Sequence, residues 1–125
     1  MLFDTDILIF VQRGNLKAAK LIEQTGEHKI SILTYMELLQ GAKDKKQHKY
    51  TIDFLKTFDF EVLPLTENIG HRAAVYVEEY SLSHHIRSGD AIIAATAVEN
   101  GLTLSTANAG HFKPIKELDL AIFRL

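Results

Sequence analysis

Short, almost continuously apolar segments alternate along this chain with longer segments in which apolar residues recur at helical spacing. The apolar segments, which we interpret as strands, are residues 1–5, 29–33, 60–65, 102–106 and 120–125. The segments with helical spacing are 15–27, 34–43, 49–58, 66–85 and 89–101. Strands that are apolar throughout are typical of parallel sheets with both faces covered. The alternation therefore predicts an α/β fold, with helices on both faces of a mostly parallel sheet.

Length and composition narrow the function classes. The 125 residues fit one domain, residues 1–125, and 46% of them are apolar, so a folded core is expected. The chain has no cysteine, which excludes disulfides, thiolate zinc sites and cysteine nucleophiles. No basic leader precedes the first apolar residues, and no apolar run is long enough to cross a bilayer. We therefore expect a soluble, cytoplasmic protein without membrane contact.

Acidic side chains follow several of the expected strands. Asp4 and Asp6 lie at the end of the first strand, Glu37 in the first turn of the helix after the second, and Asp90 at the start of a later helix. Asn108 follows the fourth strand. Because the functional crevice of an open α/β sheet lies beyond the carboxyl ends of its strands, these side chains are expected to converge there.

Converging carboxylates are destabilising unless a cation joins them. Two unit charges about 5 Å apart repel by roughly 3 kcal/mol at an effective dielectric of 20. Mg²⁺ and Mn²⁺ prefer oxygen ligands, and such an ion reverses the sign of the pocket. An ion held by few carboxylates keeps water positions that can bind a phosphate and activate a water. The expected reaction is hydrolysis of a phosphodiester, with Asp4, Glu37 and Asp90 as catalytic ligands and Asp6 as a candidate further ligand.

Each acid also has a purely structural interpretation. Thr34 and Glu37 have the spacing of a capping box, with Thr34 as the N-cap. Asp90 is favoured in a first turn by the helix dipole, and Asp6 is a suitable cap for the following turn. Asp4 is the hardest to explain in this way, because an acid within an apolar strand needs a partner.

Other polar residues surround these acids. Those expected to orient carboxylates or waters are Thr5, Ser105, Thr106 and Asn108. The net charge of −2 means that any attraction for RNA must be local. The candidate phosphate contacts are Arg87, His111, Lys43, Lys45 and Lys46. A polar loop for His111 and a solvated turn for the lysines are the structural alternatives.

Four segments together resemble the PIN-domain family, and within it the VapC-type toxins of bacterial toxin–antitoxin pairs. They are LFDTDILI, TYMELLQGA, SGDAIIAATA and LSTANAGHFKPI, and they cover nearly the whole chain in the family's order. The resemblance implies a three-layer αβα sandwich with four to five strands. It also implies an Mg²⁺ site, with Mn²⁺ as a substitute, and endoribonuclease activity on tRNA or other structured RNA. By position, Asp4, Glu37 and Asp90 look like the family's first three acids.

The resemblance further implies a small antitoxin as partner, docked on a groove of apolar residues, and a homodimer. Six apolar residues on two consecutive helices are expected to be mostly core, with some of them exposed as this groove: Tyr35, Leu38, Leu39, Phe54, Leu55 and Phe58. One departure from the family is that no acid occurs from Gly101 to Lys116. This departure favours one firmly held ion, with a second arriving with the substrate.

Two alternatives remain open at this point. A PIN-like module that binds RNA or protein without cutting it would fit the missing late acid. The start LFDTDI also resembles phosphatases of the haloacid-dehalogenase type, in which Asp4 would be the nucleophile and Asp6 its acid and base. No late pair of adjacent acids is present to complete such a phosphatase site.

Overall fold

The computed structural model describes all 125 residues. Five short strands are β1 (Leu2–Phe3), β2 (His28–Ser31), β3 (Phe60–Leu63), β4 (Leu104–Thr106) and β5 (Leu120–Ile122). Seven helices are α1 (Thr5–Gln12), α2 (Leu16–Gln24), α3 (Ile32–Gln40), α4 (Lys45–Thr57), α5 (Glu67–His84), α6 (Ser88–Glu99) and α7 (Ala109–Phe112). No helix combines the length and the apolar character that crossing a membrane requires.

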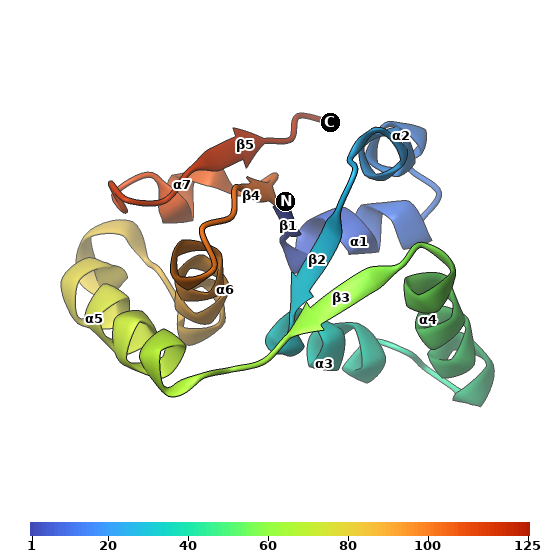
Figure 1. Cartoon of the computed structure of the whole chain (residues 1–125), viewed down its shortest axis with the longest axis horizontal. Helices are drawn as coiled ribbons and strands as arrows, with labels where there is room; N and C mark the ends of the chain where they lie inside the picture. The colour runs from blue at the N-terminus through green and yellow to red at the C-terminus, as the bar shows by residue number, and fades with distance from the viewer.

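The strands form one sheet in the order β3-β2-β1-β4-β5, and every neighbouring pair is parallel. The expectation of a mostly parallel sheet of four to five strands is confirmed, and the sheet is parallel throughout with five strands. β1 is central, since Leu2 pairs with Lys29 on one side and with Leu104 on the other. The first and last thirds of the chain therefore meet in the middle of the sheet (Figure 1).

Two hydrophobic cores lie on the opposite faces of this sheet. Leu2 belongs to the core under α5 and α6, whereas its neighbour Phe3 belongs to the core under α1, α2 and α4. Consecutive strand residues point to opposite faces, so a strand with two apolar neighbours feeds both cores. Both residues are fully buried. In Figure 1, α5 and α6 stand on one side of the strands and α1, α2 and α4 on the other, which confirms the three layers.

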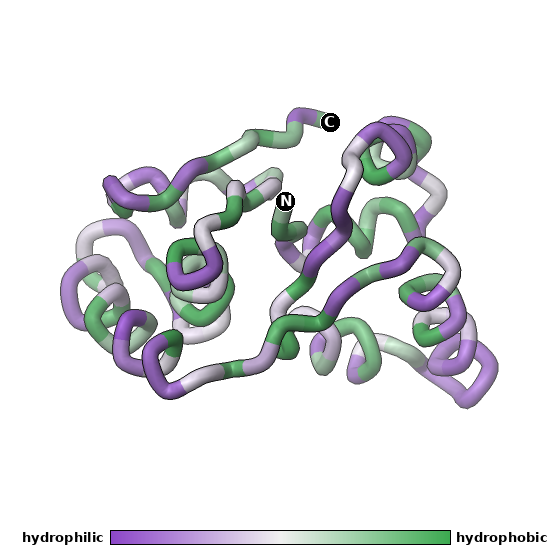
Figure 2. Tube along the Cα trace, in the orientation of Figure 1, coloured by the Kyte–Doolittle hydropathy of each residue, from purple (hydrophilic) through white to green (hydrophobic).

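Hydropathy varies along the chain. In Figure 2, hydrophilic and apolar residues both occur along β2 and β3, and hydrophilic residues gather at the outer turn that leads into α4. The small-residue helix α6 is the most enclosed, with Ala94, Ala95 and Ala97 fully buried against α5 and the sheet. Small side chains let α6 approach its neighbours closely, and this fixes where the N-terminus of α6 points.

The start of the chain differs from the sequence expectation. We expected a strand to Thr5, but β1 ends at Phe3 and a helix begins at Thr5. Asp4 is the N-cap, with its carboxylate accepting a hydrogen bond from the Thr5 amide. The apolar run from Ile7 to Val11 gave no helical period because Ile7 and Leu8 are fully buried and the next three residues are partly buried. The short helix α7 was not predicted either.

Candidate active site

The acidic residues singled out in the sequence lie where chain segments leave the carboxyl ends of the strands. Asp4 directly follows β1, and Asp6 is in the first turn of α1. Asp90 is in the first turn of α6, and Glu37 is on α3, the helix that follows β2. α3 contacts both α1 and α6, so it joins the helices that carry the three aspartates.

Asp4 is the most enclosed of these acids. Only 6% of its surface is exposed, and both carboxylate oxygens are engaged. Oδ1 accepts a hydrogen bond from the Thr5 amide at 2.8 Å, and Oδ2 accepts one from Thr106 Oγ1 at 2.7 Å. The Asp4 amide donates to the main-chain oxygen of Ser105 at 2.9 Å. Thr106 and Ser105 therefore position Asp4, Thr106 through its hydroxyl and Ser105 through its backbone.

Asp6 lies beside Asp4 and is only half satisfied. Its Oδ2 accepts a hydrogen bond from the Ala107 amide at 3.0 Å. Its Oδ1 is buried and has no hydrogen-bond partner. A buried carboxylate oxygen without a partner carries a substantial desolvation cost, so a cation beside it would be stabilising.

Burial and mutual repulsion change the proton affinity of both aspartates. Burial, the charge of Asp6 and, to a smaller extent, the charge of Asp90 raise the pKa of Asp4 to about 7. Burial also raises the pKa of Asp6, with Asp90 acting in the same direction. Three carboxylates therefore interact electrostatically at this edge of the sheet, at a cost that a bound cation would remove.

Asp90 is held by its own helix and by the segment after β4. Its Oδ2 lies 3.3 Å from the amide nitrogen of Arg87, which precedes α6. The same oxygen lies 3.1 Å from His111 Nδ1, and that nitrogen lies 3.0 Å from the Asn108 side-chain amide. The structure places His111 beside the Asp90 carboxylate, and its expected contact with phosphate stays a prediction. The main-chain N–H of Asn108 donates to Thr106 Oγ1 at 3.0 Å. Since the same hydroxyl donates to Asp4, the segment after β4 is linked to Asp4 as well.

Glu37 is connected to the aspartates through a hydroxyl rather than directly. Thr5 Oγ1 donates to Glu37 Oε1 at 2.7 Å and lies 2.9 Å from Thr34 Oγ1. The capping box expected for Thr34 and Glu37 is wrong, because α3 begins at Ile32 with Ser31 as its N-cap. Thr34 is inside the helix and completely buried, and its hydroxyl meets Thr5.

We expect replacement of Thr5 by Val to destabilise the protein by about 1–2 kcal/mol. Valine has the shape of threonine but leaves the buried Thr34 hydroxyl and the Glu37 carboxylate without this partner. Urea unfolding of the metal-free protein measures the effect. Thr5→Ser, which keeps the hydroxyl, is the matched control and should lose clearly less. Equal stability of the valine variant and the wild type would show that the hydroxyl contributes nothing.

The sequence profile of the PIN domain matches residues 1–118. The chain belongs to the PIN-domain family. Relatives named Ribonuclease VapC10 from Mycobacterium tuberculosis and Ribonuclease VapC1 from Rickettsia felis are 33% and 31% identical to it. The alignments cover 94% of this chain and 90% of the first relative, and 96% of this chain and 93% of the second.

Solved structures show the same fold as this PIN domain. A toxin–antitoxin complex from Klebsiella pneumoniae contains a chain that superimposes on this PIN domain with a TM-score of 0.83 and 31% identity. The match covers 99% of this chain and 98% of the other. VapBC2 from Rickettsia felis superimposes with a TM-score of 0.79 at 21% identity, over 98% of each chain, and supports the fold alone.

The carboxylates of this PIN domain do not form a ready-made cage for an ion. No group of three His, Asp or Glu side chains is close enough together to hold one metal. The donor chemistry nevertheless fits Mg²⁺, which is usually bound through one or two carboxylates plus water and substrate phosphate. The buried, unpartnered Oδ1 of Asp6 is the atom that most needs such a partner. The fit is therefore to an ion held by few protein ligands.

The candidate cationic residues are dispersed. Lys43 lines a groove that also includes Glu37. Lys45 and Lys46 are exposed in the first turn of α4, and Arg87 is exposed at the start of α6. The contact of these residues with RNA stays a prediction. The expectation that most of the apolar residues on α3 and α4 belong to the core is confirmed, because Leu38 and Leu55 are buried and Tyr35 and Phe54 pack against them.

Two features of the site were not predicted from the sequence. The Ala107 amide donates to Asp6, and any residue type except proline could supply this donor. Arg13, at the end of α1, lines the same groove as Lys43. Its position follows from helix α1, which was not predicted, so a correct helix assignment for residues 5–12 would have brought Arg13 into consideration.

Proposed function

We propose that this PIN domain is a Mg²⁺-dependent endoribonuclease that acts as the toxin of a type II toxin–antitoxin pair. The observation that carries the proposal is the pair Asp4, which is buried, and Asp6, which is partly buried and has one buried carboxylate oxygen without a partner, both repelled by the charge of Asp90. A fold gains no stability from such an arrangement, which points to a cation as its reason. The relatives named Ribonuclease VapC support phosphodiester cleavage in RNA as the reaction.

One or two of the carboxylates of Asp4, Asp6 and Asp90 would hold the ion together with water and substrate phosphate, and Mn²⁺ would substitute for Mg²⁺. When bound, the ion supplies charge neutralisation for the scissile phosphate and lowers the pKa of an attacking water. Thr106 and the Thr5 amide keep the Asp4 carboxylate in a fixed orientation. His111 and the Arg87 amide do the same for Asp90.

Glu37 would act at the exposed side of this cluster. Thr5 engages one of its carboxylate oxygens, and the residue is exposed to solvent. The second oxygen is therefore free to accept a hydrogen bond from water and to take up a proton as that water attacks. We propose that Glu37 completes the catalytic set in this way rather than by joining Asp4 and Asp90 around one ion.

The substrate we propose is tRNA or another structured RNA, cleaved in the cytoplasm. A small antitoxin is the proposed inhibitor, because a similar chain occurs in the toxin–antitoxin complex from Klebsiella pneumoniae. We also propose that the protein forms a homodimer. An RNase that cleaves cellular RNA must be inhibited until it is needed, which is the role proposed for the antitoxin.

The test of this function is cleavage of total tRNA by the purified protein. With Mg²⁺ or Mn²⁺ we expect defined fragments, and excess EDTA should reduce the rate by at least about a hundredfold, since loss of metal charge stabilisation costs several kcal/mol. Readdition of Mg²⁺ in excess of EDTA should restore cleavage. Fragments that form equally well in EDTA would contradict a metal-dependent site.

The alternatives predict different results. A binding module without catalysis would retain tRNA unchanged in Mg²⁺, and RNA binding would persist in EDTA. A phosphatase would use Asp4 as the nucleophile, but Asp4 is 6% exposed and both of its oxygens accept hydrogen bonds. A nucleophile needs a free, accessible oxygen. Burial of Asp4 and the PIN-domain match therefore favour the nuclease.

A further inference from the structure

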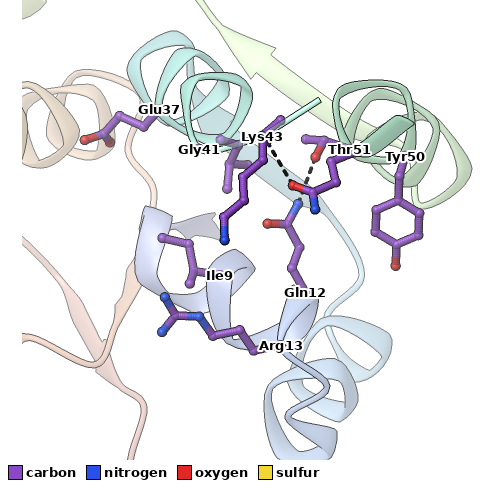
Figure 3. A pocket seen from close by; sticks show the side chains of 11 residues that line it. Ile9, Gln12, Arg13, Glu37, Gly41, Lys43, Tyr50 and Thr51 are labelled. Atoms are coloured by element: carbon purple, nitrogen blue, oxygen red, sulfur yellow. Dashed lines mark hydrogen bonds between the residues drawn. The ribbon is translucent and has the colours of Figure 1, made fainter. Parts of the chain in front are cut away.

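A groove of about 460 Å³ lies between α1, α3 and α4, with Glu37 in its wall. Its size is within the range of pockets that bind small molecules, so it can admit a short piece of a polymer chain. Figure 3 shows the Lys43 side chain extending from the end of α3 toward α1, where the Arg13 guanidinium lies beside Ile9. Two cationic groups from separate segments thus occupy one hollow that begins at the candidate active site.

These two cations have no acidic partner in the protein. The ion pairs of the structure involve Lys29, Lys49, Arg72 and two histidines, and neither Arg13 nor Lys43 is among them. Both residues follow the C-terminal ends of helices, since Arg13 is the C-cap of α1 and Lys43 comes two residues after the C-cap of α3. The partial negative charge of a helix C-terminus stabilises a cation there, so the fold holds both charges without using a carboxylate.

The remaining polar groups of the groove suit a nucleotide. Gln12 Nε2 donates to Thr51 Oγ1 at 3.0 Å, which fixes the Gln12 amide in the groove wall. Tyr50, at the outer end on α4, is 59% exposed, and its ring lies nearly parallel to that of Phe54, at 24° and 6.5 Å. An exposed aromatic ring beside a cationic groove is the combination that binds single-stranded nucleic acid, through base stacking and phosphate contacts.

We propose that this groove binds the RNA strand next to the bond that is cut, with Arg13 and Lys43 on backbone phosphates and a base stacked on Tyr50. The inference rests on the proposed RNase function and deepens it. It also accounts for how an RNA reaches an acidic site in a chain of net charge −2. The cations of the groove supply the local attraction, and they lie next to the carboxylates rather than among them.

Binding of RNA without cleavage tests the groove. The metal-free wild-type protein is titrated in EDTA against a fluorescently labelled single-stranded RNA of about 12 nucleotides, and anisotropy is followed at several salt concentrations. The double variant Arg13→Gln/Lys43→Gln should bind at least ten times more weakly. Because each phosphate contact on a single strand contributes about 0.7 to the slope of log affinity against log salt, the slope should fall by about 1.4.

The matched control removes the same charge elsewhere. Lys20→Gln/Lys116→Gln takes two positive charges from exposed positions outside the groove. Its affinity should stay within a factor of two of the wild type, with an unchanged salt slope. The proposal would be overturned if both double variants lost the same RNA affinity, if neither lost any, or if the wild type did not bind RNA. It would also be overturned if the groove bound a protein segment and no RNA.

Tyr50 gives an independent readout. Tyr50→Ala should weaken RNA binding at least fivefold without changing the salt slope, because stacking does not release counterions. Tyr50→Phe should bind as the wild type does. Weak binding by both variants would overturn the stacking assignment. RNA binding is measured without metal and is therefore separate from cleavage. If RNA binding depends on the groove residues but no cleavage occurs, only the RNase function is contradicted. If RNA is cleaved but its binding does not depend on the groove residues, only the groove assignment is contradicted.

Discussion

Asp4→Asn should abolish RNA cleavage and at the same time make the metal-free protein more stable. Asparagine can still accept the hydrogen bond from the Thr5 amide and cap α1, so the start of the helix is preserved. It removes a buried charge that is repelled by Asp6 and Asp90. We expect cleavage to fall at least about a hundredfold and the free energy of unfolding at pH 8 in EDTA to rise by about 1–3 kcal/mol.

Thermal unfolding and tRNA cleavage measure the two effects side by side. Asp119→Asn is the matched control, because Asp119 is exposed and precedes β5 at the opposite end of the sheet from the acidic residues. It makes the same change in net charge and should alter neither quantity appreciably. A lower stability of metal-free Asp4→Asn at pH 8 would mean that the charge of Asp4 stabilises the fold, contrary to the electrostatics described here.

The second large effect is a decline in the stability of the metal-free protein as the pH rises. Asp4 titrates near 3.8 in an unfolded chain and at about 7 in the fold, so the folded protein holds more protons between these values. Its favourable contribution is complete below about pH 4 and is lost as the pH rises through about 7. Asp6 shifts in the same direction. We expect a loss on the order of 2–4 kcal/mol from this cluster between pH 4 and 8.

Mg²⁺ should reverse this decline. The ion binds ionised carboxylates, so 10 mM Mg²⁺ should raise the melting temperature by at least about 5 °C at pH 8 and by much less at pH 5. Binding should also release protons near neutral pH, which calorimetry in buffers of different ionisation enthalpy detects. Asp4→Asn should flatten the pH profile and reduce the Mg²⁺ effect. The same Mg²⁺ effect at both pH values would argue that the ion binds elsewhere.

The layers of this fold could be predicted from the sequence because burial dictates them. β2, β3, β4 and β5 were each found to within a few residues, because the segments that contain them are mostly apolar. The grouping of Asp4, Asp6 and Asp90 also followed from a general rule, that side chains after parallel strands meet at one edge. These inferences needed only local pattern and topology.

What could not be predicted depends on contacts between distant segments. α1 was missed because its apolar residues from Ile7 to Val11 are consecutive in the sequence and all contribute to one core, in which Phe10 packs against Phe123. The Thr5–Thr34 hydroxyl pair joins residues 29 positions apart, and local spacing suggested a capping box instead. The groove with Arg13 and Lys43 exists only because α1 and α3 lie side by side, which no local pattern reports.

The central position of β1 has a consequence for how such an enzyme is made. The hydrogen bond from Thr106 to Asp4 joins residues 102 positions apart, and Leu2 pairs with Leu104. The segments around Asp4 and Thr106 must both be synthesised before the acidic pocket can form. We therefore expect a chain that lacks the segment around Thr106 to show no nuclease activity.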